Sequence, residues 1–242
     1  METVLSLNRL SKSFGAVKVA DEMSFDVPAG QSLGVIGPNG AGKTSLFNLI
    51  TGTLQPDVGR IQYHGKDITK DSAALRCKSG IARSFQIPQP FGAMSVFENV
   101  LVGATQGAGL SGREAEVLSL EILNQTGLMV HANSLAGSLT LLGRKRLELA
   151  RALAAKPKLL LLDEIAGGLT EGECQSLIAT IHDIKASGVT IIWIEHIVHA
   201  LLAVVDRLIV IDFGRKIADG EPKPIMDSRE VREIYMGLDA HA

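Results

Sequence analysis

A glycine-rich loop that ends in lysine and threonine spans residues 37–44, with the sequence GPNGAGKT. The apolar residues 33–36 precede it as a candidate buried strand, and residues 45–50 follow it as a helix that stops at Gly52. Glycines, which lack a Cβ, let consecutive backbone N–H groups curl around a phosphate, and the first turn of the helix adds its positive dipole. The order of strand, loop and helix therefore predicts a phosphate-binding loop.

Two side chains of this loop carry the expected chemistry. Lys43 is expected to reach the β- and γ-phosphates of a nucleoside triphosphate, and the Thr44 hydroxyl is expected to ligate Mg²⁺. The residues predicted to contact the nucleotide are Gly37, Pro38, Asn39, Gly40, Ala41, Gly42, Lys43, Thr44 and Ser45. The motif favours this interpretation over the plainer one, a glycine-rich turn in an ordinary α/β fold.

An acidic pair, Asp163 and Glu164, follows four leucines at residues 159–162. A strand that ends there places the Asp163 carboxylate beside the Mg²⁺ shell, and Glu164 can then act as the base for the water that attacks the γ-phosphate. The plainer interpretation is a pair of acids that solvate a strand end, but the phosphate-binding loop favours catalysis. A GTPase would also need an Asn-Lys-x-Asp segment to read guanine, and the sequence has none.

The N-terminal and middle regions differ in their hydrophobic pattern. Residues 4–10 and 23–27 alternate between apolar and polar side chains, which is typical of a small antiparallel sheet. From residue 96 to about residue 135 the pattern is helical. A glycine-rich break in this helical region, at Gly103, Gly107, Gly109 and Gly112, predicts a mobile connection.

The C-terminal half returns to alternating helices and strands. Residues 159–162 and 189–194 are short apolar runs that each follow a helical pattern, as buried parallel strands do. Residues 208–211 and 216–218 flank the turn sequence Asp-Phe-Gly, which predicts a hairpin.

Length and composition exclude several classes of protein. The chain has 242 residues, 46% hydrophobic and 21% charged, enough for one large domain or one domain with an inserted subdomain. Only Cys77 and Cys174 are present, which argues against a disulfide framework and a cysteine-based zinc site. No apolar run approaches the roughly 20 residues of a membrane span, and early polar residues such as Glu2 argue against a signal peptide. A formal charge of −2 gives no overall attraction to nucleic acid.

Further motifs follow the phosphate-binding loop in a fixed order: Gln86 in the segment Ser-Phe-Gln, LTLLGRKRLELARAL from Leu139, LLLLDE, and His196 in Ile-Glu-His. This order, over essentially the whole chain, resembles the ATP-binding subunit of an ABC transporter. Finer features resemble the branch that imports branched-chain amino acids. They are FQIPQPFGAMSVFENVLVGA from Phe85, RLELARAL, AGGLT after the acidic pair, and the ending VREIYMG.

The resemblance implies an α/β fold of the P-loop NTPase type. A RecA-like core with a mainly parallel sheet would carry an N-terminal antiparallel β subdomain and an inserted helical subdomain. Residues 1–242 would form a single ABC ATP-binding domain. Within it, residues 1–88 and 139–242 would make the core with the antiparallel subdomain, and residues 89–138 would make the helical subdomain.

The resemblance also implies roles for three residues outside the two acidic and glycine motifs. Phe14 would stack on adenine, although a core aromatic is the alternative. Gln86 would ligate Mg²⁺ and couple the γ-phosphate to a transmembrane partner, and His196 would hold the γ-phosphate and the attacking water. A metal site built from His196, His199 and Glu195 is a second, less favoured interpretation of the histidine. The implied catalytic set is Glu164, His196 and Gln86, with Thr44, Gln86 and Asp163 around the metal.

The segment most unlike the family pattern is its LSGGQ signature, which in the family closes over the ATP of the opposite protomer. Residues 139–143 stand at those positions and read LTLLG. Thr140 keeps a hydroxyl that can cap the following helix and donate to phosphate, but leucines replace both glycines. The alternative is an ordinary amphipathic helix with Arg144, Lys145 and Arg146 as a solvated basic face. The departure motivates the hypothesis that the chain works beside a different ATPase subunit with two unequal ATP sites.

The implied activity is hydrolysis of ATP to ADP and phosphate, coupled to transport through a membrane permease. The partners would be two transmembrane permease subunits, a second ATP-binding subunit, preferably a different chain, and indirectly an extracytoplasmic substrate-binding protein, with no nucleic acid. The chain would lie at the cytoplasmic face of the inner membrane. Alternatives are an ABC ATPase that extracts or exports lipid or lipopolysaccharide, a soluble ABC-type ATPase acting on DNA or the ribosome, and a nucleotide-binding module without turnover.

Overall fold

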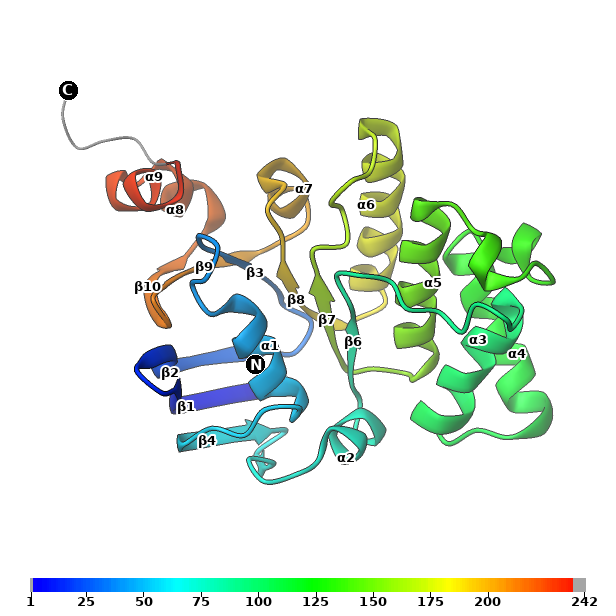
Figure 1. The fold of residues 1–242 in the computed structure, drawn as a ribbon, viewed down its shortest axis with the longest axis horizontal. Coiled ribbons are helices and arrows are strands. Elements are labelled where there is room, and N and C mark those ends of the chain that lie inside the picture. Colours follow the sequence, from blue (N-terminus) through cyan, green and yellow to red (C-terminus); the bar gives the residue numbers. More distant parts are fainter. Residues whose placement is uncertain (1, 237–242) are drawn as a thin grey trace.

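Two β-sheets of different kinds organise the chain (Figure 1). The computed structural model describes residues 2–236. The first sheet is antiparallel, in the order β2-β1-β4-β5. Its strands are β1 (Thr3–Phe14), β2 (Val17–Pro28), β4 (Val58–Tyr63) and β5 (Lys66–Asp67).

The second sheet has the order β10-β9-β3-β8-β7-β6, and all its strands are parallel except the edge strand β10. Its strands are β3 (Ser32–Ile36), β6 (Ile81–Ser84), β7 (Leu159–Asp163), β8 (Thr190–Ile194), β9 (Arg207–Asp212) and β10 (Arg215–Gly220). Parallel strands need long connections, and helices supply most of them. This mainly parallel sheet beside an antiparallel one confirms the expected fold class.

The helices divide into three groups along the chain. Near the first sheet lie α1 (Lys43–Thr51) and α2 (Ala73–Lys78). On the far right of Figure 1, α3 (Val96–Val102) and α4 (Gly112–Gln125) pack against α5 (Leu141–Ala154). The remaining helices are α6 (Glu171–Ala186), α7 (Val198–Leu202), α8 (Pro222–Asp227) and α9 (Arg229–Met236). A π-helical turn occupies Gly103–Gly107, and 3₁₀ turns occupy Met129–His131 and Ala136–Ser138.

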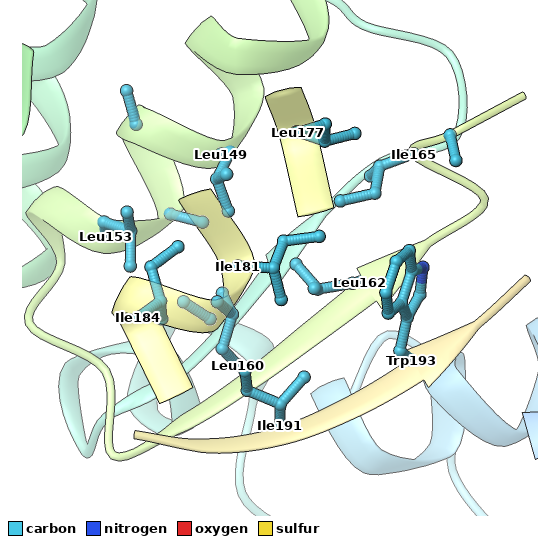
Figure 2. Packing of buried hydrophobic residues seen from close by; sticks show 14 of the residues in the cluster. Leu149, Leu153, Leu160, Leu162, Ile165, Leu177, Ile181, Ile184, Ile191 and Trp193 are labelled. Carbon is cyan, nitrogen blue, oxygen red and sulfur yellow. The ribbon is translucent and has the colours of Figure 1, made fainter. Parts of the chain in front are cut away.

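The leucine run of β7 faces two hydrophobic cores, because successive side chains of a strand point to opposite faces. Leu159 and Leu161 join the core that contains α1 and the antiparallel sheet. Leu160 and Leu162 join the other core, where Figure 2 shows them beside Ile181 of α6. Burial on both faces explains why this strand is a continuous apolar run.

The carboxyl ends of β3, β7 and β8 lie at one edge of the sheet. Val35 of β3 and Asp163 of β7 both pair with Ile194 of β8, from opposite sides. The loops that follow these three strands therefore start close together, although they are far apart in the sequence. This edge is where ligands bind in open α/β sheets.

Most of the expected elements are confirmed: the antiparallel pair β1–β2, the buried parallel strands β7 and β8, the helix after the glycine loop, and the β9–β10 hairpin. The ending VREIYMG forms part of α9 up to Met236, and its last residue, Gly237, lies outside the described residues. No helix within residues 2–236 is both long and apolar enough to cross a membrane.

The expected glycine-rich break after α3 is wrong for its first two glycines, because the chain stays helical through Gly103 and Gly107. A Cβ on Gly103 would lie 2.5 Å from the carbonyl oxygen of Arg151, and one on Gly107 would lie 2.6 Å from the Cβ of Ala155. These glycines let the π-helical turn approach α5 closely, which is a packing role and not a flexible one.

Candidate nucleotide-binding and catalytic site

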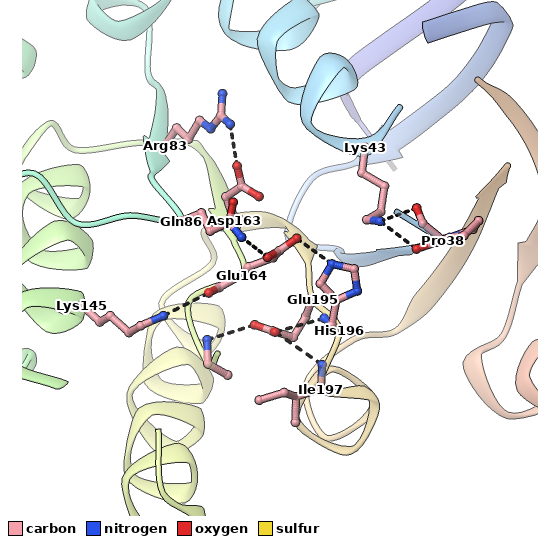
Figure 3. Close-up of polar contacts among 12 residues, drawn as sticks. Pro38, Lys43, Arg83, Gln86, Lys145, Asp163, Glu164, Glu195, His196 and Ile197 are labelled. Carbon is pink, nitrogen blue, oxygen red and sulfur yellow. Dashed lines mark hydrogen bonds and ion pairs between the residues drawn. The ribbon is translucent and has the colours of Figure 1, made fainter. Parts of the chain in front are cut away.

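The glycine loop joins the end of β3 to the start of α1, as the motif requires. Gly42 caps α1 with a φ of 104°, and a Cβ there would lie 2.3 Å from the carbonyl oxygen of Val19, so only glycine fits. Lys43 is 6% exposed, and its Nζ donates to the carbonyl oxygens of Gly37 at 2.7 Å and Pro38 at 2.9 Å. Its ammonium group is thus held inside the curve of the loop (Figure 3).

The charge of Lys43 interacts with two acidic side chains, Asp163 at the end of β7 and Glu164 directly after it. Burial lowers the pKa of Lys43, and the nearby carboxylates of Glu164 and Asp163 oppose this shift. Thr44 is exposed in the first turn of α1, where its hydroxyl can meet a ligand in the loop. The structure therefore brings the lysine of the glycine motif within electrostatic range of both acids.

Asp163 ends β7 as a nearly fully buried carboxylate. Its Oδ2 accepts a hydrogen bond from Arg83 Nη2 at 2.5 Å, while its buried Oδ1 has no hydrogen-bond partner within residues 2–236. Burial raises the pKa of Asp163, and the Arg83 guanidinium opposes the rise. A buried carboxylate oxygen without a donor fits a cation, so the residues present are suited to Mg²⁺.

Glu164 lies between the two other predicted catalytic residues (Figure 3). Its Oε1 is 2.7 Å from His196 Nε2, and its Oε2 accepts a hydrogen bond from Gln86 Nε2. Its backbone has a φ of 47°, a left-handed conformation that costs free energy for a non-glycine residue, and its N–H donates to the carbonyl oxygen of Ile194. Three residues from three distant segments thus meet in one hydrogen-bonded cluster.

Sequence reasoning missed the role of Glu195. Its buried carboxylate accepts hydrogen bonds from the backbone N–H groups of Ala166 and His196, both at 3.0 Å, and of Ile197 at 3.4 Å. Burial raises the pKa of Glu195, and these three N–H donors oppose the rise. The carboxylate therefore ties the loop after β7 to the loop after β8. The competing metal site at His196, His199 and Glu195 is wrong, since the described residues contain no cluster of three or more His, Cys, Asp or Glu able to hold a metal.

Lys145 also holds the loop after β7, so the alternative of a solvated basic face on α5 is wrong for this residue, although the neighbouring Arg144 is exposed. Lys145 is buried, and its Nζ donates to the carbonyl oxygen of Glu164 at 3.1 Å. Burial lowers its pKa, and the charges of Glu195 and Glu164 oppose the shift. The neighbouring Arg144 and Arg146 donate to the Leu139 carbonyl oxygen and to Ser176 Oγ. The only sequence signal was a basic residue two positions after Gly143.

Phe14 ends β1 and is 55% exposed, so the core alternative is wrong. Lys12 Nζ lies 5.6 Å from the centre of the ring. An exposed aromatic ring at the end of a strand is available for stacking on a base.

Thr140 caps α5, as expected, since its side chain accepts a hydrogen bond from the N–H of Gly143 at 3.2 Å. Leu141, which replaces the first signature glycine, is exposed, and its Cδ2 would lie 3.3 Å from a Cβ placed on Gly168, which is also exposed. The hydroxyl of Thr140 thus serves its own helix, outside the cluster around Glu164.

Comparison with known proteins supports the same assignment. The family model for ABC transporters matches residues 20–167. The high-affinity branched-chain amino acid transport ATP-binding protein BraF of Pseudomonas aeruginosa is 34% identical over 97% of this chain and 98% of that protein. The lipopolysaccharide export system ATP-binding protein LptB of Haemophilus influenzae is 30% identical over 97% of this chain and 98% of that protein.

Solved structures agree with this result. The crystal structure of an ABC transporter ATP-binding cassette in its ADP conformation is 34% identical, with a TM-score of 0.88 over 98% of this chain and 100% of that one. The resemblance inferred from the motifs is therefore confirmed at the level of sequence and fold. The chain belongs to the ABC transporter family, in which it is an ATP-hydrolysing cassette.

Proposed function

We propose that this chain energises an ABC importer of branched-chain amino acids by hydrolysing ATP on the site around Glu164. The observation that carries the catalytic part is the pair of contacts from Glu164 to Gln86 and His196. A carboxylate held from both sides at the edge where β3 and β7 end is placed to take a proton from a water molecule. The transported substrate is inferred from relatives such as BraF.

Each residue of the site has a proposed role in this reaction. Residues 37–45 wrap the phosphates, Lys43 offsets their charge, and Phe14 stacks on adenine. Glu164 orients and deprotonates the attacking water while His196 and Gln86 hold its carboxylate. Mg²⁺, held by Thr44, Asp163 and Gln86, would supply positive charge beside the phosphates.

We also propose the division of the chain into a core, residues 1–88 and 139–242, and a helical subdomain, residues 89–138. The helices α3 and α4 favour this division because they lie together on one side of the fold (Figure 1). Their packing on α5 would allow the two parts to transmit movement to each other.

A groove between these parts suits a segment of a permease subunit. It encloses about 550 Å³ and has a mostly apolar lining that includes Cys77, Phe85, Val102 and Ala155. Phe85 is exposed and directly precedes Gln86, so an occupant of the groove would touch the loop that holds Glu164. The chain is proposed to lie at the cytoplasmic face of the inner membrane, where its partners are two transmembrane permease subunits, served by an extracytoplasmic binding protein.

The second ATP-binding subunit is proposed to be a different chain. Leu141 stands where a glycine would allow a close approach to the nucleotide of a facing protomer, and its exposed side chain adds bulk at that position. The α5 helix of this chain therefore offers its partner a less accessible phosphate contact than a glycine signature would.

We expect low ATP turnover from this chain alone and a clear rise when the second ATP-binding subunit is added. Phosphate release measured for each subunit and for the mixture tests this. Thr140→Ala removes the cap of α5 at a cost of about 1 kcal/mol and should lower the turnover of the mixture. Ser95→Ala, which removes the matching cap of α3, is the control. Full activity of the lone chain, unaffected by Thr140→Ala, would contradict the heterodimer.

The substrate assignment has a separate test. Purified together with its permease subunits and placed in proteoliposomes, the chain should hydrolyse ATP faster when a binding protein loaded with leucine is added. Lipopolysaccharide is the comparison, because LptB, a relative of similar coverage, belongs to an export system. If lipopolysaccharide, and not the amino acid, stimulates ATP hydrolysis, the proposed function changes from amino-acid import to lipopolysaccharide export.

A further inference from the structure

Arg83 makes direct contact with the carboxylate proposed to bind the metal, and the proposed function does not use it. It lies on β6, the edge strand that pairs with β7. Its Nη2 donates to Asp163 Oδ2 at 2.5 Å, and its Nη1 donates to Asn48 Oδ1 of α1 at 2.7 Å (Figure 3 shows the contact with Asp163). One guanidinium thus joins the strand of the acidic pair to the helix of the phosphate-binding loop.

Two aromatic rings hold this guanidinium in place. The carbon at its centre lies 5.4 Å from the ring centre of Phe47 and 5.1 Å from that of Phe85. The side chains of Arg83 and Asp163 are only 7% and 3% exposed. A planar group held by two hydrogen bonds and two rings has one orientation, which a lysine ammonium on a flexible stem would not reproduce.

The contact with Arg83 leaves one oxygen of Asp163 for another ligand. Oδ2 is occupied by the guanidinium, whereas the buried Oδ1 has no donor within residues 2–236. A carboxylate that is hydrogen-bonded through one oxygen cannot turn freely, so the direction of the other oxygen is set. We propose that Arg83 is a positioning residue that holds Asp163 Oδ1 toward the metal of the ATP site.

This inference rests on the proposed metal site and extends it to a residue next to the groove. Arg83 and Phe85 both line the groove proposed for the permease. The same guanidinium therefore touches the metal-binding carboxylate on one side and the groove loop on the other.

The test measures how much Mg²⁺ strengthens nucleotide binding. The dissociation constant of the fluorescent analogue mant-ATP is measured with EDTA and then with Mg²⁺, for the wild-type chain, Arg83→Lys and Arg83→Gln. We expect the EDTA values to stay within about twofold of wild type, while the gain from Mg²⁺ falls by about tenfold or more, the size of one charge-assisted hydrogen bond.

Arg76→Lys is the matched control for loss of a buried arginine. Arg76 is 1% exposed, and its guanidinium donates to the carbonyl oxygens of Leu49 and Ile50 at the end of α1, of Asp71 and of Thr69. Its replacement should lower the melting temperature without changing the gain from Mg²⁺, since none of its acceptors belongs to the metal site.

The possible results distinguish a failure of the role proposed for Arg83 from a failure of the proposed metal site on which that role rests. If Mg²⁺ does not strengthen mant-ATP binding to the wild-type chain, the proposed metal site is wrong. If Mg²⁺ strengthens mant-ATP binding to folded Arg83→Lys and Arg83→Gln as much as to the wild-type chain, the role proposed for Arg83 is wrong, while the metal site stands. If both variants fail to fold, Asn48→Ala is measured in their place, because it removes the second acceptor of the guanidinium. The inference then requires that Mg²⁺ strengthens mant-ATP binding less in Asn48→Ala than in the wild-type chain. An unchanged gain in Asn48→Ala would then refute the inference.

Discussion

Replacing Glu164 by glutamine is expected to lower ATP turnover by about 10²–10⁴-fold while ATP binding persists. The amide has the shape of the carboxylate and can keep a contact with Gln86, but it cannot take a proton from water. The phosphate-binding loop is untouched, so the nucleotide should remain bound and hold closed the dimer with the second ATP-binding subunit. Phosphate release measures the turnover, and mant-ATP fluorescence with gel filtration measures binding and dimer formation.

The control for this substitution is Glu116→Gln, which neutralises an exposed glutamate of α4 away from the site. It should leave turnover unchanged. Wild-type turnover in Glu164→Gln would refute the assignment of Glu164 as the base. We would then propose that His196, which contacts this carboxylate as Gln86 does, holds the attacking water.

Lys43→Ala is expected to weaken ATP binding by about 10²-fold or more, because two or more charge-assisted hydrogen bonds to phosphate are lost together. In the structure the ammonium is held by the carbonyl oxygens of Gly37 and Pro38, so it is already positioned inside the loop before a phosphate arrives. Hydrolysis should fall with binding. Titration with mant-ATP measures the affinity directly.

Lys66→Ala, which removes an exposed lysine of β5, controls for the loss of one positive charge. Thermal unfolding must accompany the titration, because the alanine also leaves two carbonyl oxygens of the loop without their donor. If a folded Lys43→Ala chain binds ATP with wild-type affinity, the glycine loop is not part of the nucleotide-binding site.

The errors made from the sequence come from contacts between distant segments. Glycines in a helical region normally indicate a break, but Gly103 and Gly107 are required by the nearness of Arg151 in α5 and of Ala155 at its C-terminal end. Lys145 belongs to a basic run that is typical of a solvated helix face, yet its ammonium reaches the carbonyl oxygen of Glu164. Neither neighbour can be deduced from local pattern, because each depends on how α5 packs.

The sequence by itself determined the class of protein and predicted the residues that are proposed to carry its chemistry. A phosphate-binding loop is a local structure, since its glycines, lysine and helix follow one another within residues 37–51. The strand before Asp163 is equally local, because continuous burial selects a continuous apolar run. Family resemblance then assigned Gln86 and His196 to the same site.

Only the tertiary structure decided how these residues are held. The contact of Gln86 with Glu164 spans 78 residues, and that of Arg83 with Asp163 spans 80. Parallel strands bring such distant segments together at one sheet edge. Glu195 and Lys145 bind backbone groups, and a backbone group has no sequence signature by which it could be predicted as a partner. Arg83 occupies Oδ2 of Asp163 and leaves Oδ1 without a donor among the described residues, and this arrangement depends on the packing of Arg83 near the rings of Phe47 and Phe85.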